Sequence, residues 1–421
     1  MTPAETGVLL EHLFRRQAGR IVSHLTSLLG PANLDLAEET MQEAMLRALQ
    51  TWPYQGIPER AEGWLFRVAH NAAIDALRRR RFSVPAAEDT DDTIAALAHA
   101  ADTMPDRPDL DEQLRDEELR MIFMCCHPDI PRDASVALSL KTVGGFGVNE
   151  IARAFLAEEA TIAQRLVRAK RQIRENRLTL DMPAAFDLPR RLDAVLETIY
   201  FIFNEGYTAH EGDTLIRHDL CGEALRLGQL IAGSSLAAPR VHGLVALMAF
   251  QAARSAARVD PFGDLVVLEE QDRSRWDTHL IALGFHHFGQ SIAGDQPSEY
   301  HVQAAIAATH ARAASGGEAD WRTILSLYDD LRAMNPSPVV ILNRAVAVAK
   351  VYGPGAALEA IEPLQADAKL RTYYLLHALR GHLMLELGRR REAADSFRAA
   401  LECRCSEPER RFLRRRLASC A

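Results

Sequence analysis

The sequence has little that would place it in a membrane or hold it together covalently. Its most apolar run, Val241–Ala253, is too short to span a bilayer, so we expect no contact with a membrane. The first residues include Glu5 and Glu11 and form no long apolar core, from which we expect no signal peptide. The six cysteines are scattered without a disulfide framework, which is typical of a reduced, cytoplasmic setting.

Motifs for metal binding and catalysis are also missing. Cys403-Arg404-Cys405 and Cys125-Cys126-His127 lack the four paired ligands of a structural zinc site, so we expect no metal and no cofactor. The sequence has no phosphate-binding glycine loop and no nucleophile elbow. Acidic residues crowd a glycine-containing turn at Phe203–Asp213, where an enzyme or a small-ligand sensor could be centred. Helix capping explains such residues better, so we predict no catalytic residues and a protein that is not an enzyme.

Alternation of Val, Ile and Thr is nearly absent, which argues against a β-rich fold. Instead, Ala, Leu, Arg and Glu recur at spacings of three and four, which predicts an all-α protein. The chain has 421 residues, of which 48% are hydrophobic, enough for two to four domains. The net charge of −8 argues against general coating of nucleic acid, so any DNA contact must come from local basic faces.

An acidic helix is predicted at residues 35–50. Its apolar stripe is Met41, Met45, Ala48 and Leu49, and its other side carries Glu38, Glu39, Gln42 and Glu43. A solvated face is the ordinary explanation of such a pattern. The alternative is a surface that docks onto a basic partner helix. Residues 52–58, which contain two prolines and a glycine, are predicted to form a loop.

The helix predicted next, Trp64–Arg81, has a polar face and a basic end. Arg67, Asn71, Asp75 and Arg78 recur at i, i+4, i+8 and i+11, and four consecutive arginines close the helix. The helix macrodipole favours cations at this end, but four arginines exceed what a cap requires. Together with Asn71, they provide donors for both phosphates and bases.

A helix-turn-helix is predicted at Val148–Arg177. Its second helix has a buried stripe of Ile162, Leu166, Ala169 and Ile173. From residue 160 to residue 177 it carries many basic residues against the single acid Glu175. Glutamine and arginine on its exposed side favour reading of the DNA major groove over an ordinary surface helix.

Two further segments organise the chain. Phe82–Asp111 places three prolines among many aspartates, which predicts a flexible charged tether. Near the C-terminus, small and bulky residues recur at the offsets of a tetratricopeptide repeat, which we favour over generic helical hairpins. The two copies are Ala345, Ala357, Ile361 and Leu364, and Gly381, Ala393, Phe397 and Ala400.

In combination, these segments resemble the extracytoplasmic-function sigma factors of the sigma-70 family. Asp35–Leu49 resembles their core-polymerase-binding helix, and Gly63–Asp75 resembles their −10 recognition and melting helix. Glu150–Phe155 and Thr161–Arg174 resemble their −35-reading region. From about Pro189 onward, the chain resembles the extension of a subgroup that carries a fused tetratricopeptide-like domain.

The resemblance implies an all-α protein with two sigma-type helical domains, the second with the helix-turn-helix, and a helical-repeat domain. The implied domains are 1–82 (sigma region 2), 83–111 (acidic linker), 112–180 (sigma region 4), 189–300 (helical extension) and 301–421 (tetratricopeptide-like repeats). It implies an alternative sigma factor with core RNA polymerase and promoter DNA as partners. The extension would regulate it, through a regulatory protein or an intramolecular contact.

The resemblance also implies three sets of site residues. The core-polymerase-binding set is Asp35, Glu38, Glu39, Gln42 and Glu43. The −10 set is Trp64, Arg67, Asn71, Arg78, Arg79, Arg80 and Arg81, beside the loop before it. The −35 set is Thr161, Gln164, Arg165, Arg168, Lys170 and Arg171. Ala163 stands where relatives can have a polar reader, which leaves the base preference open.

One alternative class stays open on the sequence. A DNA-binding regulator could use the helix-turn-helix alone, with the repeats as a platform for partners, and act without core polymerase. Copurification with core polymerase distinguishes the two classes.

Overall fold

The computed structural model describes residues 17–83, 90–103, 110–155, 157–207, 215–293, 297–313, 319–366 and 370–420. They form helices and turns, with one isolated bridge between Val259 and Leu265, so the all-α prediction is confirmed. Among the described helices, none combines the length and the apolar character that a membrane crossing needs. The chain divides into two compact units, Met1–Thr198 and Ile199–Ala421, and helix α9 (Leu188–Tyr207) runs across the division.

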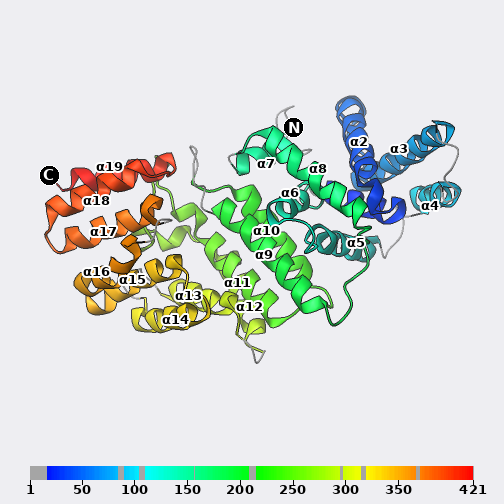
Figure 1. Ribbon diagram of the computed structural model, residues 1–421. Helices are drawn as coiled ribbons and strands as arrows, with labels where there is room; N and C mark the ends of the chain where they lie inside the picture. Colours follow the sequence, from blue (N-terminus) through cyan, green and yellow to red (C-terminus); the bar gives the residue numbers. More distant parts are fainter. Residues whose placement is uncertain are drawn as a thin grey trace. The chain divides into compact units, whose positions relative to one another are not determined.

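The first unit consists of helices joined by short connections (Figure 1). Residues 17–29 form its first described helix. The others are η1 (Pro31–Asn33), α2 (Leu34–Gln55), α3 (Ala61–Ser83), α4 (Thr90–Thr103), α5 (Leu110–Cys125), α6 (Arg132–Thr142), α7 (Val148–Ala154) and α8 (Glu159–Glu175).

Helix α2 is longer than the sequence predicts. It continues through Trp52 and Pro53, which the sequence assigns to a loop, and ends where Gly56 takes a φ of 85°. Pro53 is tolerated because it lies in the last turn, where it removes a single backbone hydrogen bond. The side chain of Trp52 is buried, whereas Leu49, predicted to be buried, is largely exposed. Burial of Trp52 against the neighbouring helix outweighs the local preference for a turn.

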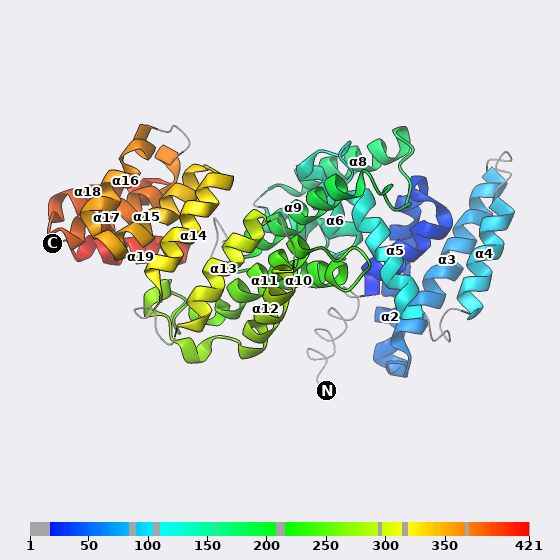
Figure 2. The ribbon, with the colours of Figure 1, turned by 90° about the horizontal axis from the view of Figure 1, so that it is seen from below.

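The acidic tether is partly helical. Residues 90–103 form α4, which packs against α3 (Figure 2), with Leu97 and Ala100 buried. The prediction of a flexible segment is therefore wrong for these residues, because Leu97 and Ala100 lie on one face and find an apolar partner in α3. Residues 84–89 and 104–109, on either side of α4, lie outside the described part of the chain.

The segment predicted to form a helix-turn-helix contains the two helices α7 and α8. Its four predicted stripe residues, Ile162, Leu166, Ala169 and Ile173, are the buried residues of α8, so this prediction is confirmed. The stripe packs on α6 and α7. At the start of α7, Glu150 Oε2 accepts a hydrogen bond from the backbone N–H of Gly147 at 2.6 Å, which fixes the first turn.

The second unit is a succession of helices in which each packs mainly on its neighbours in sequence (Figures 1 and 2). Its α-helices after α9 are α10 (His218–Ala232), α11 (Pro239–Ala253), α12 (Thr278–Ser291), α13 (Glu299–Arg312), α14 (Trp321–Met334), α15 (Pro338–Tyr352), α16 (Pro354–Ile361), α17 (Tyr374–Glu386), α18 (Arg390–Glu402) and α19 (Glu407–Ala418). Its short 3-10 helices are η3 (Ser255–Ala257), η4 (Leu268–Glu270), η5 (Arg273–Arg275), η7 (Glu362–Ala366) and η8 (Leu370–Thr372).

The proposed repeat residues lie at helix–helix contacts. Ala345, Ala357 and Ile361 are fully buried where α15 meets α16. In the next hairpin, a Cβ added to Gly381 of α17 would lie 2.9 Å from the ring of Phe397 on α18. The absence of a side chain at Gly381 thus leaves room for the Phe397 ring, which is the pairing of small and bulky residues that the predicted repeat requires. Assignment of these hairpins to tetratricopeptide repeats stays a prediction.

Replacing Gly381 with valine should destabilise the second unit by about 1–3 kcal/mol, because the added carbons must displace the Phe397 ring. Gly289 of α12 is the matched control, since nothing lies within 4 Å of its Cβ position. Gly289→Ala should be neutral or slightly stabilising. Hydrogen exchange of the α17 and α18 amides in the full chain measures the difference. Equal protection in wild type and Gly381→Val would contradict the packing role of this glycine.

Candidate functional site

The acidic side of α2 is divided between solvent and α8. Glu39 and Gln42 are exposed, and Glu43 is partly exposed. Asp35 and Glu38, in the first turns of the helix, contact α8 instead. The five residues predicted to form one docking surface therefore lie in two environments. Asp35 and Glu38 contact α8, and only Glu39, Gln42 and Glu43 are accessible to a partner.

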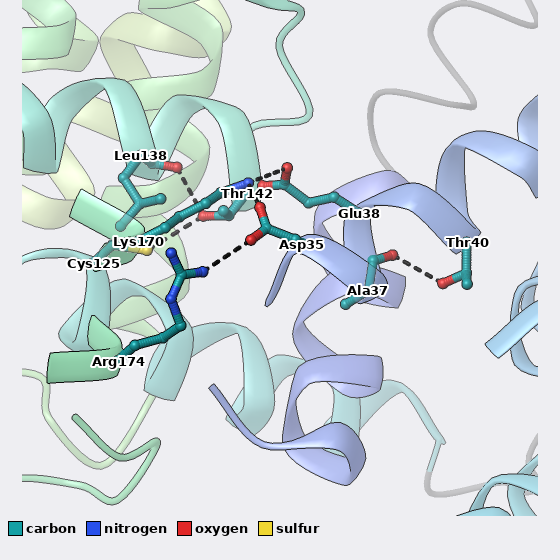
Figure 3. A network of polar contacts seen from close by, with 9 residues as sticks. All are labelled: Asp35, Ala37, Glu38, Thr40, Cys125, Leu138, Thr142, Lys170 and Arg174. Carbon is teal, nitrogen blue, oxygen red and sulfur yellow. Dashed lines mark hydrogen bonds and ion pairs between the residues drawn. The ribbon is translucent and has the colours of Figure 1, made fainter. Parts of the chain in front are cut away.

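Four charged residues join α2 to α8, and we call them the ion-pair cluster. Lys170 Nζ lies 2.6 Å from Asp35 Oδ1 and 2.9 Å from Glu38 Oε2 (Figure 3). Arg174 Nη1 lies 3.0 Å from Asp35 Oδ2. The side chains of Lys170 and Glu38 are only 12% and 10% exposed, so they form a buried pair, whereas the Arg174–Asp35 pair lies at the surface.

The cluster changes the prediction for Lys170. The sequence groups this lysine with the exposed basic residues of α8, but the structure places it against α2. The physical reason is its position next to Ala169, a member of the buried stripe. A long side chain at the edge of that stripe reaches the carboxylates of the neighbouring helix.

Both partners in the cluster have shifted pKa values. Burial alone would raise the pKa of the Asp35 carboxyl, but the hydrogen bonds and charges of Lys170 and Arg174 bring it below its ordinary value of 3.8. Burial alone would lower the pKa of the Lys170 ammonium, but Glu38 and Asp35 bring it above its ordinary value of 10.5. Each partner therefore stabilises the charged form of the other.

A close backbone approach supports the same arrangement. A Cβ added to Gly19, in the helix at residues 17–29, would lie 1.8 Å from the carbonyl oxygen of Val143, which follows α6. Only glycine permits this contact. In the same helix, His24 Nδ1 lies 2.7 Å from Glu117 Oε2 of α5. Segments that the sequence assigns to separate domains thus pack against each other within the first unit.

The polar face predicted on α3 is exposed. Arg67, Asn71 and Arg78 all face solvent, as their spacing predicts. Trp64 is only partly exposed because its ring packs edge to face on Trp52, with 5.4 Å between ring centroids. The face therefore keeps its charged and amide groups available, with an aromatic pair at its N-terminal end.

The basic end of α3 is described in part. Arg79 is exposed like Arg78, and the side chains of Arg80 and Arg81 lie outside the described part of the structure. Asp75 Oδ1 lies 4.0 Å from Arg78 Nη1, a solvent-exposed pair that holds Arg78 only weakly.

Beneath this face lies a histidine that the sequence reasoning missed. His70 is fully buried, and its Nδ1 lies 2.7 Å from the carbonyl oxygen of Phe66. Burial, and then the neighbouring His24, lower the pKa of His70 to about 3. The imidazole is therefore neutral and belongs to the packing of the helix at residues 17–29 on α3. A histidine on the apolar side of a helical stripe is the signal that could have revealed it.

The outer face of α8 is open. Thr161, Gln164 and Arg168, three of the residues predicted to contact the −35 element, are exposed. Val167 lies among them and is 63% exposed. These residues form a short surface of mixed polarity along the first half of α8.

Two further predicted readers are held by carboxylates. Arg165 Nε lies 3.0 Å from Asp133 Oδ2 of α6, and Arg171 Nε lies 2.6 Å from Glu175 Oε1 one turn later in α8. Both pairs are largely solvent-exposed, so each arginine can exchange its carboxylate for a phosphate or a base at small cost.

The described part of Phe203–Asp213 has a packing role. The rings of Phe203 and Tyr207 stack with 5.5 Å between centroids, and Arg258 lies 4.1 Å from the centroid of the Tyr207 ring. The remainder of the segment, including His210, Glu211 and Asp213, lies outside the described residues.

Comparison with known proteins shows which class of protein these surfaces belong to. Residues 13–83, which include α2 and α3, match sigma-70 region 2. The chain therefore contains a sigma-70 region 2 domain. Residues 191–292 match a family of unknown function (DUF6596). An uncharacterized protein of Rhizobium meliloti (strain 1021) is 42% identical over 390 residues, which cover 91% of this chain and 90% of that protein. No solved structure matches the chain.

The sigma-70 region 2 match supports a sigma-factor-like role in transcription initiation, and such a domain implies core RNA polymerase and promoter DNA as partners. The predicted core-binding and −10 segments both fall within the matched residues. Helix α8 lies outside them, so its assignment to the −35 element stays a prediction.

The two halves of the ion-pair cluster should differ in strength. Lys170→Met leaves Glu38 buried without a partner and should cost about 3–5 kcal/mol. Arg174→Met removes an exposed contact and should cost ~0–1 kcal/mol. Hydrogen exchange of the α2 and α8 amides in the full chain measures both.

The same experiment has a pH dependence. The Lys170 contribution is complete below pH 10.5 and is lost as the pH rises through its raised pKa. The Asp35 contribution is complete above pH 3.8 and is lost as the pH falls through its lowered pKa. The contribution of the Lys170–Asp35 pair to the stability of the wild-type protein should therefore be constant between these limits. A steady change across neutral pH, or equal losses in the two variants, would contradict the cluster.

Proposed function

We propose that the protein is an alternative sigma factor of the extracytoplasmic-function type. It binds core RNA polymerase through α2, opens the −10 element with α3 and reads the −35 element with α8. The match of residues 13–83 to sigma-70 region 2 is the observation that carries the proposal. The exposed acidic, polar and basic faces of these helices support it.

Docking uses the outward carboxylates of α2. Glu39 and Gln42 are exposed, and Glu43, which pairs with Arg47 one turn later at the surface, can exchange this partner for a basic helix of the polymerase at small cost. Such a surface adds orientation and speed of association as well as affinity. Asp35 and Glu38 join it only after they leave Lys170.

Promoter opening uses the start and the polar face of α3. The loop between α2 and α3, together with Arg67 and Asn71, holds an unstacked base of the −10 non-template strand. Stacking and hydrogen bonds to the captured base offset part of the unstacking cost, so no ATP is needed. The arginines at the end of α3 bind backbone phosphates, which position the strand without reading its sequence.

The −35 element is read by the open face of α8. Thr161, Gln164 and Arg168 reach base edges in the major groove, which admits a helix. Arg165 joins them when it exchanges Asp133 for DNA.

The ion-pair cluster makes this assembly stepwise. While Lys170 and Arg174 hold Asp35 and Glu38, the two helices cannot take up the separate positions that a polymerase and two promoter elements require. The cluster therefore keeps the free protein closed. A basic polymerase helix can replace Lys170 at Glu38, so that the carboxylate regains a cationic partner as the two helices separate.

The second unit regulates this step. Its hairpins form tetratricopeptide-like repeats, which offer extended surfaces for a protein partner. A regulatory protein bound there, or an intramolecular contact made by the unit, shifts the balance between the closed and the open form.

The docking surface is tested by reversing the charge of Glu39 and Glu43 to lysine. Affinity for sigma-free core polymerase should fall by at least tenfold, while the fold is kept, because both side chains are solvent-exposed or nearly so. Asp395→Lys on α18 is the matched control, since its side chain is exposed and far along the chain. Unchanged affinity in the double variant would contradict the assignment of α2.

The reading surface is tested on promoter duplexes bound by the reconstituted holoenzyme. Arg168→Ala should weaken binding to the preferred −35 sequence by about 1–3 kcal/mol relative to a scrambled duplex. Arg165→Ala should have a smaller effect, because wild-type Arg165 must first leave Asp133. An equal loss on both duplexes would make Arg168 a phosphate contact. No loss on either would remove α8 from the interface.

A further inference from the structure

The second unit contains a cavity of about 390 Å³ between its helices. Helices α11, α13, α14 and α15 supply most of its lining, and Tyr200 of α9 and Trp276, which follows η5, complete it. The cavity lies where residues of the family of unknown function meet the C-terminal helices. Its volume lies within the ~300–1,000 Å³ of typical small-molecule sites.

The lining carries a positive charge that no described carboxylate neutralises. Arg254 lies at the end of α11, and its Nε donates a hydrogen bond to the Tyr207 hydroxyl at 2.5 Å. Among the described residues, no carboxylate forms an ion pair with it. Glu299, the acidic residue of the lining, accepts a hydrogen bond from Asn335 Nδ2 at 2.9 Å instead.

A second arginine adds to this charge from behind the lining. Arg273 stacks on Trp276, with 4.0 Å from its guanidinium carbon to the ring centroid, and its Nη1 donates to the carbonyl oxygen of His310 at 2.6 Å. Its Nε and Nη2 are buried and make no hydrogen bond in the described structure. Burial, and then Arg254 and Arg273, lower the pKa of His310 to about 4, so its imidazole is neutral.

The cavity also holds polar atoms that lack partners among the described residues. Gln251 Oε1, Trp276 Nε1 and His310 Nδ1 are buried and make no hydrogen bond there. Buried polar atoms without partners are costly, so this cluster is unusual for a region that serves packing alone. Around these atoms, Phe250 and Tyr328 provide aromatic walls.

We propose that this cavity binds a small organic anion with an apolar or aromatic body. The anionic group, a carboxylate or a phosphate, lies against Arg254 and the His310 side of the cavity, and the body lies between Phe250 and Tyr328. The lining comes partly from residues 191–292 and partly from the helices after them, so a bound ligand joins these two groups of helices. The site gives the extension a means to sense a metabolite.

Probes of one shape and different charge test the proposal on the full chain. Benzoate, phenyl phosphate, benzamide and benzylamine are titrated by isothermal calorimetry and by ligand-observed NMR. One of the two anions should bind about tenfold or more tightly than benzamide and benzylamine, and the tighter anion identifies the head group. Inorganic phosphate alone should bind more weakly than phenyl phosphate. Equal binding of benzamide, or no binding of either anion, would overturn the proposal.

Three variants locate the binding. Arg254→Met should abolish binding of the anion. Ala307→Leu, which fills the cavity without changing its charge, should also abolish binding of the anion. The conclusion then does not depend on correct folding of Arg254→Met alone. Arg332→Met on α14 is the control, because its side chain is half exposed and does not line the cavity. Anion binding that survives both cavity variants would place the site elsewhere and overturn the proposal.

Discussion

The contact of Lys170 with Asp35 and Glu38 is the constraint on which the first unit depends. Lys170 pairs with both carboxylates at a place that water barely reaches, and separation of α2 and α8 would break these contacts. The close approach of Gly19 to the Val143 carbonyl joins the helix at residues 17–29 to the segment after α6 in the same unit. Under the proposed function, two surfaces that must separate are thus held together by their own charges.

The same contact determines which charged groups of the first unit are accessible and which are engaged. Glu39 and Gln42 stay open and can meet a polymerase first, while the carboxylates nearer the helix start remain engaged. The open half of α8 and the polar face of α3 present separate groups for DNA. In the second unit, by contrast, Arg254 has no carboxylate partner among the described residues, and the proposed ligand would supply the negative charge.

Much of this could be predicted from the sequence, because helical periodicity is a local property. The buried stripe of α8 and the exposed spacing of Arg67, Asn71 and Arg78 follow from residues a few positions apart. Lys170 and Glu38 could not be predicted, because their pairing joins residues 132 positions apart. Residues 90–103 were missed because their acidic, proline-flanked composition hides a short apolar face that needs α3. The cavity depends on tertiary packing alone.

The account is tested most directly by the distance between α3 and α8 before and after core polymerase is added. Spin labels at Asp75→Cys and Val167→Cys, both exposed positions, report it by electron double resonance, with Cys403 and Cys420 replaced by serine. The free protein should give one narrow distribution of distances, and the polymerase complex should give a longer distance as the ion-pair cluster opens. An unchanged distance in the complex, or the absence of any complex with core polymerase, would contradict the account.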